Sequence, residues 1–331
     1  MSADRPSVLV TGASGFTGGH LARGLADRGY RVRVLVRDAG RARDLAAAGL
    51  DPCLGDLRDA AALERASAGV ATVYHIAAIY RRAGVPAAEY RAVNVEAVGG
   101  LVRAAARAGA RRVVHCSTVG VHGDVEHPPA DEDAPFRPGD IYQDTKLEGE
   151  RVARDEAERG GVELVVARPS GIYGPGDRRL LKLFRGVAHR RFAILGRGEI
   201  YYHLTYIDDL VEGFHLCGTV PAAAGRTYIL AGGEVGTLRE LVEAIAEEAG
   251  VKAPALRLPV WPVWLAGALC EAVCVPLRVE PPLYRRRVDF FTKSRAFDIG
   301  RARAELGFSP RIGLREGIRR TLAWYCQRGW I

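Results

Sequence analysis

A tyrosine and a lysine four residues apart are the first residues of this sequence that could do chemistry together. Tyr142 and Lys146 lie in the string YQDTK, within a stretch of helical spacing, so both side chains should share one face of a helix. A tyrosine with an ordinary pKa of about 10 becomes a useful acid or base near neutral pH when a cation favours its phenolate. Only four of the 47 basic residues are lysines, which argues against a chance pairing. We therefore predict an acid–base pair, the plainer alternative being a surface lysine beside a half-buried tyrosine.

Two hydroxyl side chains follow an apolar run in the string VVHCSTVGVHG. Ser117 and Thr118 come directly after this run, which predicts that they lie at the carboxyl end of a strand. A hydroxyl there could donate a hydrogen bond to a carbonyl oxygen and share its developing charge with the tyrosine. Serine and threonine also form simple turns at strand ends, and the proximity of Tyr142 and Lys146 favours the catalytic interpretation.

Strands and helices that could position these side chains alternate along the first half of the chain. Strand-like runs occur at residues 8–11, 32–36, 72–75, 113–116 and 163–167, and helical spacing occurs at 16–28, 60–67, 95–108 and 144–159. The runs are apolar on both faces, which is typical of a parallel sheet covered on each side by helices. The sequence therefore predicts a doubly wound parallel α/β sheet of the Rossmann type.

The pattern changes after residue 168, where glycine and proline interrupt shorter and more mixed segments. We predict a dinucleotide-binding domain at residues 1–168 and a smaller C-terminal lobe, mainly substrate-binding, at 169–331. Residues 204–216 and 226–231 look like a further helix and strand that return to the first domain. Such an arrangement makes a cleft between the sheet and the lobe.

Three glycines lie between the first strand-like run and the first helical stretch. Gly12, Gly15 and Gly18 have the spacing G-x-x-G-x-x-G. Glycines at this place allow a tight turn and let backbone N–H groups approach a pyrophosphate at the start of a helix. We interpret them as a dinucleotide-binding loop, the alternative being a glycine turn without a ligand.

The end of the second predicted strand bears on the choice of dinucleotide. Arg37 lies there and could bind the 2′-phosphate of NADP, whereas its neighbour Asp38 could bind the ribose hydroxyl of NAD. We expect NADP in preference to NAD, with NAD left open. Asp56, after the third predicted strand, could accept a hydrogen bond from the adenine amino group.

These motifs together resemble the extended short-chain dehydrogenase/reductase family over nearly the whole chain. The similar strings are TGASGFTG, YHIAA, STVGVHG, YQDTK, ARPSGIYGPGD and the C-terminal segment at 296–325. The resemblance implies that hydride passes between a nicotinamide and a carbinol or carbonyl carbon. It also implies that Tyr142 transfers the proton, Lys146 lowers the pKa of Tyr142 and holds ribose hydroxyls, and Thr118, beside Ser117, positions the oxygen.

The resemblance adds further residues to the expected cofactor site. These are Ser14, Phe16, Leu57, Ala77, Ala78, Asn94 and Pro169. Asn94 matches a helix position near the cofactor, although a helix asparagine is often merely packed or exposed.

The substrate is less well defined by the sequence. We assign Tyr80, His203 and Arg285 to substrate contacts. His203 lies near the place where sugar-nucleotide members of the family usually carry an arginine. The missing arginine argues against a sugar-nucleotide epimerase or dehydratase, which we keep as an alternative. A non-catalytic, redox-sensing dinucleotide-binding protein is a second alternative, against which Tyr142 and Lys146 argue.

An apolar stretch at residues 258–279 favours a bulky apolar substrate. Pro259, Pro262 and Pro276 interrupt it, so we expect no membrane-spanning helix. We expect instead a helical wall over an apolar pocket, with Trp261 and Trp264 suited to such a substrate, and leave an interfacial membrane contact or an ordinary packed helix open.

Composition sets the remaining expectations. The formal net charge is +8, but the arginines are interleaved with alanine and acidic residues, so we expect a small-molecule substrate and no nucleic-acid partner. Six scattered cysteines without a CxxC pair indicate reduced thiols, and no metal site is expected. A strand-like run begins near residue 7, so we expect no secretory leader. The reduced thiols indicate a cytoplasmic location. We also expect a homodimer.

Overall fold

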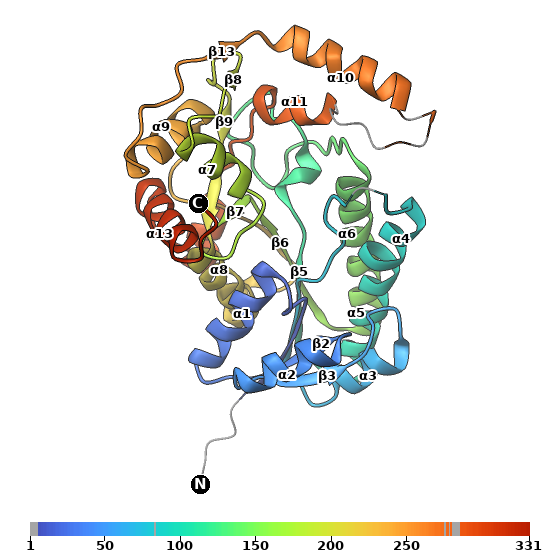
Figure 1. The fold of residues 1–331 in the computed structure, drawn as a ribbon. Coiled ribbons are helices and arrows are strands. Elements are labelled where there is room, and N and C mark those ends of the chain that lie inside the picture. Colours follow the sequence, from blue (N-terminus) through green and yellow to red (C-terminus); the bar gives the residue numbers. More distant parts are fainter. Residues whose placement is uncertain (1–5, 83, 275, 278, 280–284) are drawn as a thin grey trace.

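A computed structural model describes residues 6–331 except 83, 275, 278 and 280–284; the side chains of 285–287 and 289 are also outside the described part. Figure 1 shows a central sheet between layers of helices, with further short strands and helices beyond the carboxyl edge of the sheet.

The central sheet has seven parallel strands in the order β11-β6-β5-β4-β1-β2-β3. Their bounds are β1 Ser7–Thr11, β2 Arg31–Val36, β3 Asp51–Leu54, β4 Thr72–His75, β5 Arg112–Cys116, β6 Glu163–Pro169 and β11 Thr227–Leu230. The order reverses between β1 and β4, where ligands bind in open α/β sheets. The predicted doubly wound parallel fold is confirmed.

Alternate residues of the strands enter two separate hydrophobic cores, one on each face of the sheet. Val8 and Val10 point into the core shared with α1, α2, α8 and α12, whereas Leu9 points into the core shared with α3, α5 and α6. The helices are α1 Phe16–Asp27, α2 Ala39–Ala47, α3 Ala60–Ser67, α5 Ala97–Arg107, α6 Ile141–Gly160, α8 Ile207–Thr219 and α12 Gly300–Leu306. The sequence placed α6 at 144–159, and the helix begins three residues earlier because Asp140 caps it by accepting from the Gln143 N–H.

A third hydrophobic core lies beyond the sheet, among α7, α9 and α13. The elements there are α7 Leu181–Ala188, α9 Leu238–Glu248, α10 Val260–Cys274, α11 Arg285–Thr292 and α13 Leu314–Gln327. The short strands, in hydrogen-bonded pairs, are β7 Gly171–Tyr173 with β10 Leu204–Tyr206, β8 Ile194–Leu195 with β13 Arg257–Leu258, and β9 Tyr201–Tyr202 with β12 Gly236–Thr237. Before α5, the short helix α4 Ala87–Arg91 continues into a π-helical turn at Ala92–Glu96. Among the described residues, no helix is both long and apolar enough to cross a bilayer.

A buried ion pair attaches α6 to the end of β6. The Arg168 guanidinium donates from Nε and Nη2 to the two carboxylate oxygens of Glu150, at 3.0 and 2.7 Å, and both side chains are 3% exposed. Arg168 Nη1 also donates to the Glu132 carbonyl oxygen at 2.9 Å and lies 3.2 Å from His122 Nε2. These contacts tie the helix that carries Tyr142 to the sheet edge.

The consequence for stability can be measured by removing one charge of the pair. Glu150→Gln keeps the side-chain size but leaves the Arg168 charge buried without its counter-ion, so the free energy of unfolding should fall by about 3–5 kcal/mol. Urea denaturation with linear extrapolation measures the change.

Glu148 provides a matched control two positions earlier on the same helix. It forms an ion pair with Arg91 whose side chains are 34% and 53% exposed. Glu148→Gln should therefore lower the free energy of unfolding by less than about 1 kcal/mol. Equal losses for the two variants would show that burial of the Arg168–Glu150 pair has no special weight.

Candidate functional site

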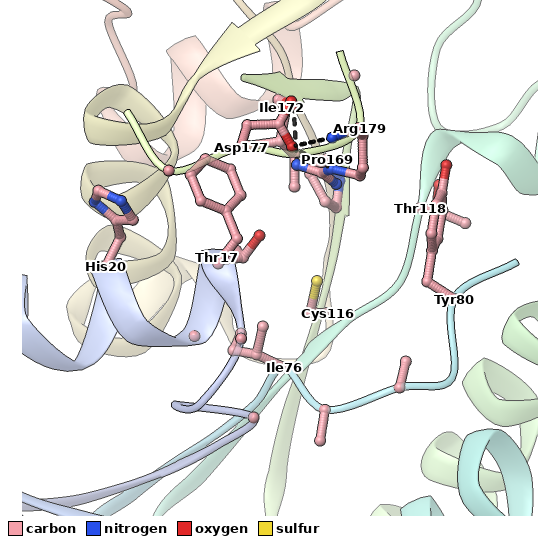
Figure 2. Close-up of a pocket in the computed structure, with 18 of the residues that line it drawn as sticks. Thr17, His20, Ile76, Tyr80, Cys116, Thr118, Pro169, Ile172, Asp177 and Arg179 are labelled. Atoms are coloured by element: carbon pink, nitrogen blue, oxygen red, sulfur yellow. Dashed lines mark hydrogen bonds and ion pairs between the residues drawn. The ribbon is translucent and has the colours of Figure 1, made fainter. Parts of the chain in front are cut away.

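A cavity of about 900 Å³ lies at the carboxyl edge of the sheet, where the strand order reverses. The loops after β1, β4, β5 and β6 form one side of it, and residues of the C-terminal half, among them Tyr202, Arg295 and Phe297, form the other. In Figure 2, Thr17 and His20 of α1 lie on one side of the cavity and Tyr80 and Thr118 on the other, with Cys116 between them.

The glycine loop leaves no room for side chains. Gly12 has φ +75°, and a Cβ there would lie 2.8 Å from the Ala77 backbone nitrogen. A Cβ on Gly18 would lie 2.3 Å from the Gly12 carbonyl oxygen. The helix α1 starts after Gly15 without a side-chain cap, so its first N–H groups face the cavity edge without a side-chain acceptor. An open helix start behind a tight glycine turn fits the pyrophosphate of a dinucleotide.

The loop after β4 is held against the glycine loop by Thr11. The Thr11 hydroxyl oxygen accepts from the N–H groups of Ile76 and Ala77, each at 3.2 Å, and lies 2.8 Å from His75 Nδ1. Thr11 and His75 are paired residues of β1 and β4, so the sheet register brings them together. These bonds fix the wall formed by Ala77 and Ala78.

Tyr142 lies in the wall on the first turn of α6. Its ring makes an edge contact with Tyr80 at 4.9 Å between centroids. Arg81 lies against both rings and forms an ion pair with Asp140 at 2.7 Å. Burial raises the pKa of the Tyr142 phenol far above its usual value, and the charges of Arg81 and Arg179 oppose this rise. The phenol is therefore protonated at neutral pH in this structure.

Lys146 lies one turn further along α6, below the cavity wall, and is 1% exposed. Its ammonium Nζ lies 3.5 Å from His115 Nε2. Burial lowers the pKa of Lys146, and the positive charge of Lys146 adds to burial in keeping the pKa of His115 well below its usual value. His115 is therefore neutral and accepts from the lysine.

Ser117 and Thr118 both line the cavity but differ in their bonding. The Ser117 hydroxyl is buried and has no hydrogen-bond partner among the described residues. The Thr118 hydroxyl oxygen accepts from the Gly120 N–H at 3.0 Å, which leaves its proton for donation. Both hydroxyl groups can thus serve as donors to an oxygen in the cavity.

Most residues that the sequence assigns to the cofactor or substrate lie in the cavity wall. They are Gly12, Ser14, Gly15, Phe16, Gly18, Ala77, Ala78, Tyr80, Ser117, Thr118, Tyr142, Pro169 and His203.

Asn94 does not lie in the cavity wall, which corrects its expected place beside the cofactor. It is fully buried, accepts from the Ile79 N–H at 2.9 Å, and donates to the Ile79 carbonyl and to Thr145. Its amide satisfies the backbone of the Ile79 loop, so it joins that loop to α6 instead of facing a ligand.

Arg37 and Asp56 lie together beyond the wall, at the ends of β2 and β3. Arg37 is 73% exposed and its Nη1 lies 3.7 Å from an Asp56 carboxylate oxygen. Arg58 donates two closer bonds to the same carboxylate, and these lower the pKa of Asp56 to about 2. The nearby Asp38 caps α2 by accepting from the Arg41 N–H, and Leu57 packs against the core under β2.

The expected substrate residues have different surroundings. Tyr80 is open to the cavity. His203 also lines it, but Nε2 bonds to the Gly232 carbonyl at 2.8 Å and Nδ1 accepts from the Phe297 N–H at 3.3 Å, so only ring surface is left for a ligand. Arg285 starts α11, and its side chain lies outside the described part of the structure.

The helix α10 corrects a further expectation. It was expected to form a wall over an apolar pocket, yet none of its described residues lines the cavity. It lies on the outside of the molecule, packed along α11 (Figure 1), because α11 and Tyr202 separate it from the cavity.

Several wall residues were missed in the sequence. Arg81 and Arg179 stand on loops, and nothing local distinguishes them among 43 arginines. Asp177, in the string GPGD, holds Arg179 at 2.8 Å and accepts from the Leu180 N–H, so this string carried a usable signal. Cys116 precedes Ser117 at the end of β5 and could have been named from that position.

Three comparisons place these features among known proteins. The model of the NAD-dependent epimerase/dehydratase family matches residues 8–231. A 2-alkyl-3-oxoalkanoate reductase of Stenotrophomonas maltophilia is 30% identical over 96% of this chain and 98% of its own. A 3 beta-hydroxysteroid dehydrogenase/Delta 5-->4-isomerase of Mycobacterium tuberculosis is 31% identical over 96% of this chain and 90% of its own. The solved structure of MoeE5 in complex with UDP-glucose and NAD has a TM-score of 0.76 and 29% identity, and covers 97% of this chain and 99% of that one.

The thiol of Cys116 gives a chemical test of the cavity. Burial raises the pKa of Cys116 to about 11, so about one thiol in a thousand is ionised at pH 8. Its alkylation by iodoacetamide should be slow at pH 8 and rise about tenfold per pH unit up to pH 10. Peptide mass spectrometry measures the rate, with the exposed Cys326 reacting faster at pH 8 as the internal reference. Fast, pH-independent labelling of Cys116 would contradict its described surroundings.

Proposed function

The chain belongs to the NAD-dependent epimerase/dehydratase family, and we propose that it is an oxidoreductase that interconverts a secondary alcohol and a ketone on a bulky, largely apolar substrate. The observation that carries this proposal is that three groups line one cavity: the protonated phenol of Tyr142, the donor hydroxyl of Thr118, and the Ser117 hydroxyl, which has no partner in the part of the chain that the structure describes. An acid and hydrogen-bond donors that line the same cavity suit a carbonyl oxygen that gains charge.

The residues present fit a nicotinamide dinucleotide. Gly12, Gly15 and Gly18, with the uncapped start of α1, would hold its pyrophosphate, and Ala77, Ala78 and Pro169 would line its path. When bound, the dinucleotide accepts or supplies the hydride of the reaction. Ser14 and Phe16 lie at the same loop and would complete its contacts.

The chain's own residues would manage the proton. In the reducing direction, the Tyr142 phenol donates its proton to the carbonyl oxygen as that oxygen becomes a hydroxyl. Ser117 and Thr118 donate hydrogen bonds to the same oxygen and hold it in place. In the oxidising direction the phenolate takes the proton from the alcohol, and this step needs the pKa of the phenol to be lower than in the structure described above.

Lys146 would supply that lowering. It lies one helical turn from Tyr142, and its positive charge favours the phenolate. Its contact with the neutral His115 keeps the ammonium hydrogen-bonded while it is buried. We assign Lys146 a second role as donor to ribose hydroxyls.

The substrate class rests on the relatives and on the wall. The two relatives are named for a 3-oxoalkanoate and a 3-hydroxysteroid, each with an oxygen function on an apolar skeleton. Tyr80, Tyr202, Ile172 and Phe297 give this cavity apolar surface, and Tyr80 contacts Tyr142.

A sugar-nucleotide epimerase is the second candidate, and one observation favours it. Arg179 and Arg295 line the cavity and could meet a diphosphate. An epimerase oxidises and re-reduces its substrate and would keep its dinucleotide through purification. Mass spectrometry of the denatured protein separates the two candidates: a full complement of NAD favours the epimerase.

The cofactor choice yields a prediction at Arg37. Its guanidinium is mostly exposed and only loosely paired with Asp56, so it is available to a 2′-phosphate. NADPH should bind more tightly than NADH, and Arg37→Ala should weaken NADPH binding about tenfold with little change for NADH. Calorimetric titration measures both, with Arg107→Ala on α5 as a surface control. Equal affinities of the unchanged protein for NADPH and NADH would contradict a role of Arg37 in binding the 2′-phosphate.

The reaction yields a prediction at Tyr142. Tyr142→Phe keeps the ring contact with Tyr80 but removes the transferable proton, so kcat should fall by about 10²- to 10⁴-fold while dinucleotide affinity hardly changes. Steady-state kinetics on the true substrate and dinucleotide titration measure the two effects. Activity within a few-fold of the unchanged protein would contradict acid–base catalysis by Tyr142.

Lys146→Met and Thr118→Val separate the roles of the neighbours. Lys146→Met should weaken dinucleotide binding and move the acid–base pKa upward in the pH–rate profile, because the cation that favours the phenolate is gone. Thr118→Val should slow turnover without either change, and Ser117→Ala should have a milder effect.

A further inference from the structure

The outer face of α10 is an apolar stripe open to solvent. Trp261, Leu265, Leu269 and Val273 recur every four residues and lie on one face of the helix. Their exposed fractions are 69, 45, 61 and 60%. Gly267 is the one buried residue among the described positions of α10. A continuous exposed apolar surface of this kind marks a place where another molecule binds. We call these four residues the α10 stripe.

The α10 stripe lies one layer away from the cavity. α10 packs along α11, as Figure 1 shows at the top of the molecule. The Phe290 ring of α11 makes an edge contact with Tyr202 at 5.2 Å, and Tyr202 lines the cavity. A molecule bound at the stripe would therefore lie close to the substrate side of the site.

The segment of the sequence that contains the α10 stripe is rich in basic residues. Residues 250–297 carry eight basic residues against three acidic ones, and the whole chain has a net charge of +8. Lys252 and Arg257 are exposed just before α10, and Glu271 is the single charged residue within it. Two exposed basic residues thus precede the apolar stripe, in a segment whose sequence is basic overall, and they complement an anionic surface.

We propose that the α10 stripe binds the surface of an anionic lipid bilayer, with α10 lying in the plane of the interface. Its apolar side chains enter the boundary of the acyl chains, while the basic residues stay near the headgroups. Trp261 and Trp264 stand at the end of the helix next to Arg257, where indole rings favour the headgroup level. Fifteen residues give a helix of about 22 Å, short of the roughly 30 Å of a bilayer core, so α10 lies on the membrane and does not cross it.

A second copy of the chain fits the α10 stripe less well. A two-fold contact through the stripe would bring the same basic flanks of two molecules together and repel. Anionic lipids neutralise those charges instead. This placement would also give the site access to an apolar substrate held in the bilayer, and that link rests on the proposed function. The proposed binding to the bilayer does not rest on it.

Co-sedimentation of the full chain with vesicles tests the proposal without substrate. The protein should pellet with phosphatidylcholine vesicles that contain about 30% phosphatidylglycerol, bind pure phosphatidylcholine more weakly, and lose affinity in about 0.5 M salt. Leu269→Asp/Val273→Asp should weaken binding to the anionic vesicles by at least about tenfold.

Two exposed positions of α13 provide the matched control. Ala323→Asp/Gln327→Asp has the same spacing, the same helical setting and the same added charge, and should bind as the unchanged protein does. Circular dichroism and turnover of a soluble substrate show that both variants fold. A failure of turnover with intact vesicle binding would count against the proposed function alone.

Tryptophan fluorescence locates the contact. Brominated lipids should quench the unchanged protein, and Trp261→Tyr/Trp264→Tyr should abolish quenching although Trp324 and Trp330 are still present. Equal vesicle binding by the α10 and α13 variants, or equal binding to neutral and anionic vesicles, would overturn the proposal. The proposal would also be overturned if the unchanged protein were a dimer and the α10 variant were a monomer with unchanged vesicle binding, because a second copy of the chain would then cover the stripe.

Discussion

The buried pair of Arg168 and Glu150 fixes the depth at which α6 meets the sheet, and the positions of Tyr142 and Lys146 depend on that depth. Hydrophobic packing alone would allow α6 to slide along the sheet, because apolar contacts have no direction. The two parallel hydrogen bonds of the pair do have a direction, and both side chains are almost completely buried. A pair of apolar residues of the same size could be as stable, so we attribute the pair to positioning more than to stability.

The same network reaches from α6 to the edge of the sheet. Arg168 donates to the Glu132 carbonyl, and the Glu132 carboxylate accepts from the Ile229 N–H of β11 at 2.8 Å. His122, which follows Thr118 by one short turn, lies against Arg168 as well. The contacts of the Arg168 guanidinium therefore link the loop after Thr118, the helix that carries Tyr142 and the edge strand β11. These links restrict how far the three elements can move relative to one another.

The features that the sequence predicted are those that local rules determine. The alternating apolar runs specified the sheet, because strands buried on both faces have few polar residues, and the glycine spacing specified a loop whose conformation excludes side chains. The candidate site follows from these two features, since parallel strands bring their carboxyl ends to one edge.

The expectations for Asn94 and α10 were wrong because they depended on which neighbour covers a residue. An asparagine in a helix gives no sign that a loop 15 residues away will occupy its amide. An apolar run in the sequence likewise predicts burial, but it does not show whether the chain itself or another molecule covers it. Arg81 and Arg179 matter through long-range packing, which no spacing records.

The place of β11 in the chain has a consequence for synthesis. β11 covers the open side of β6 in the finished sheet but is made about sixty residues after it. At about 5–20 residues per second, β6 spends several seconds on the ribosome as an apolar edge strand with unpaired backbone groups. Its sequence, ELVVARP, has a single glutamate and a single arginine to discourage pairing with another chain. The nascent protein therefore passes through an interval in which aggregation competes with folding, and a chaperone that shields edge strands would have its largest effect there.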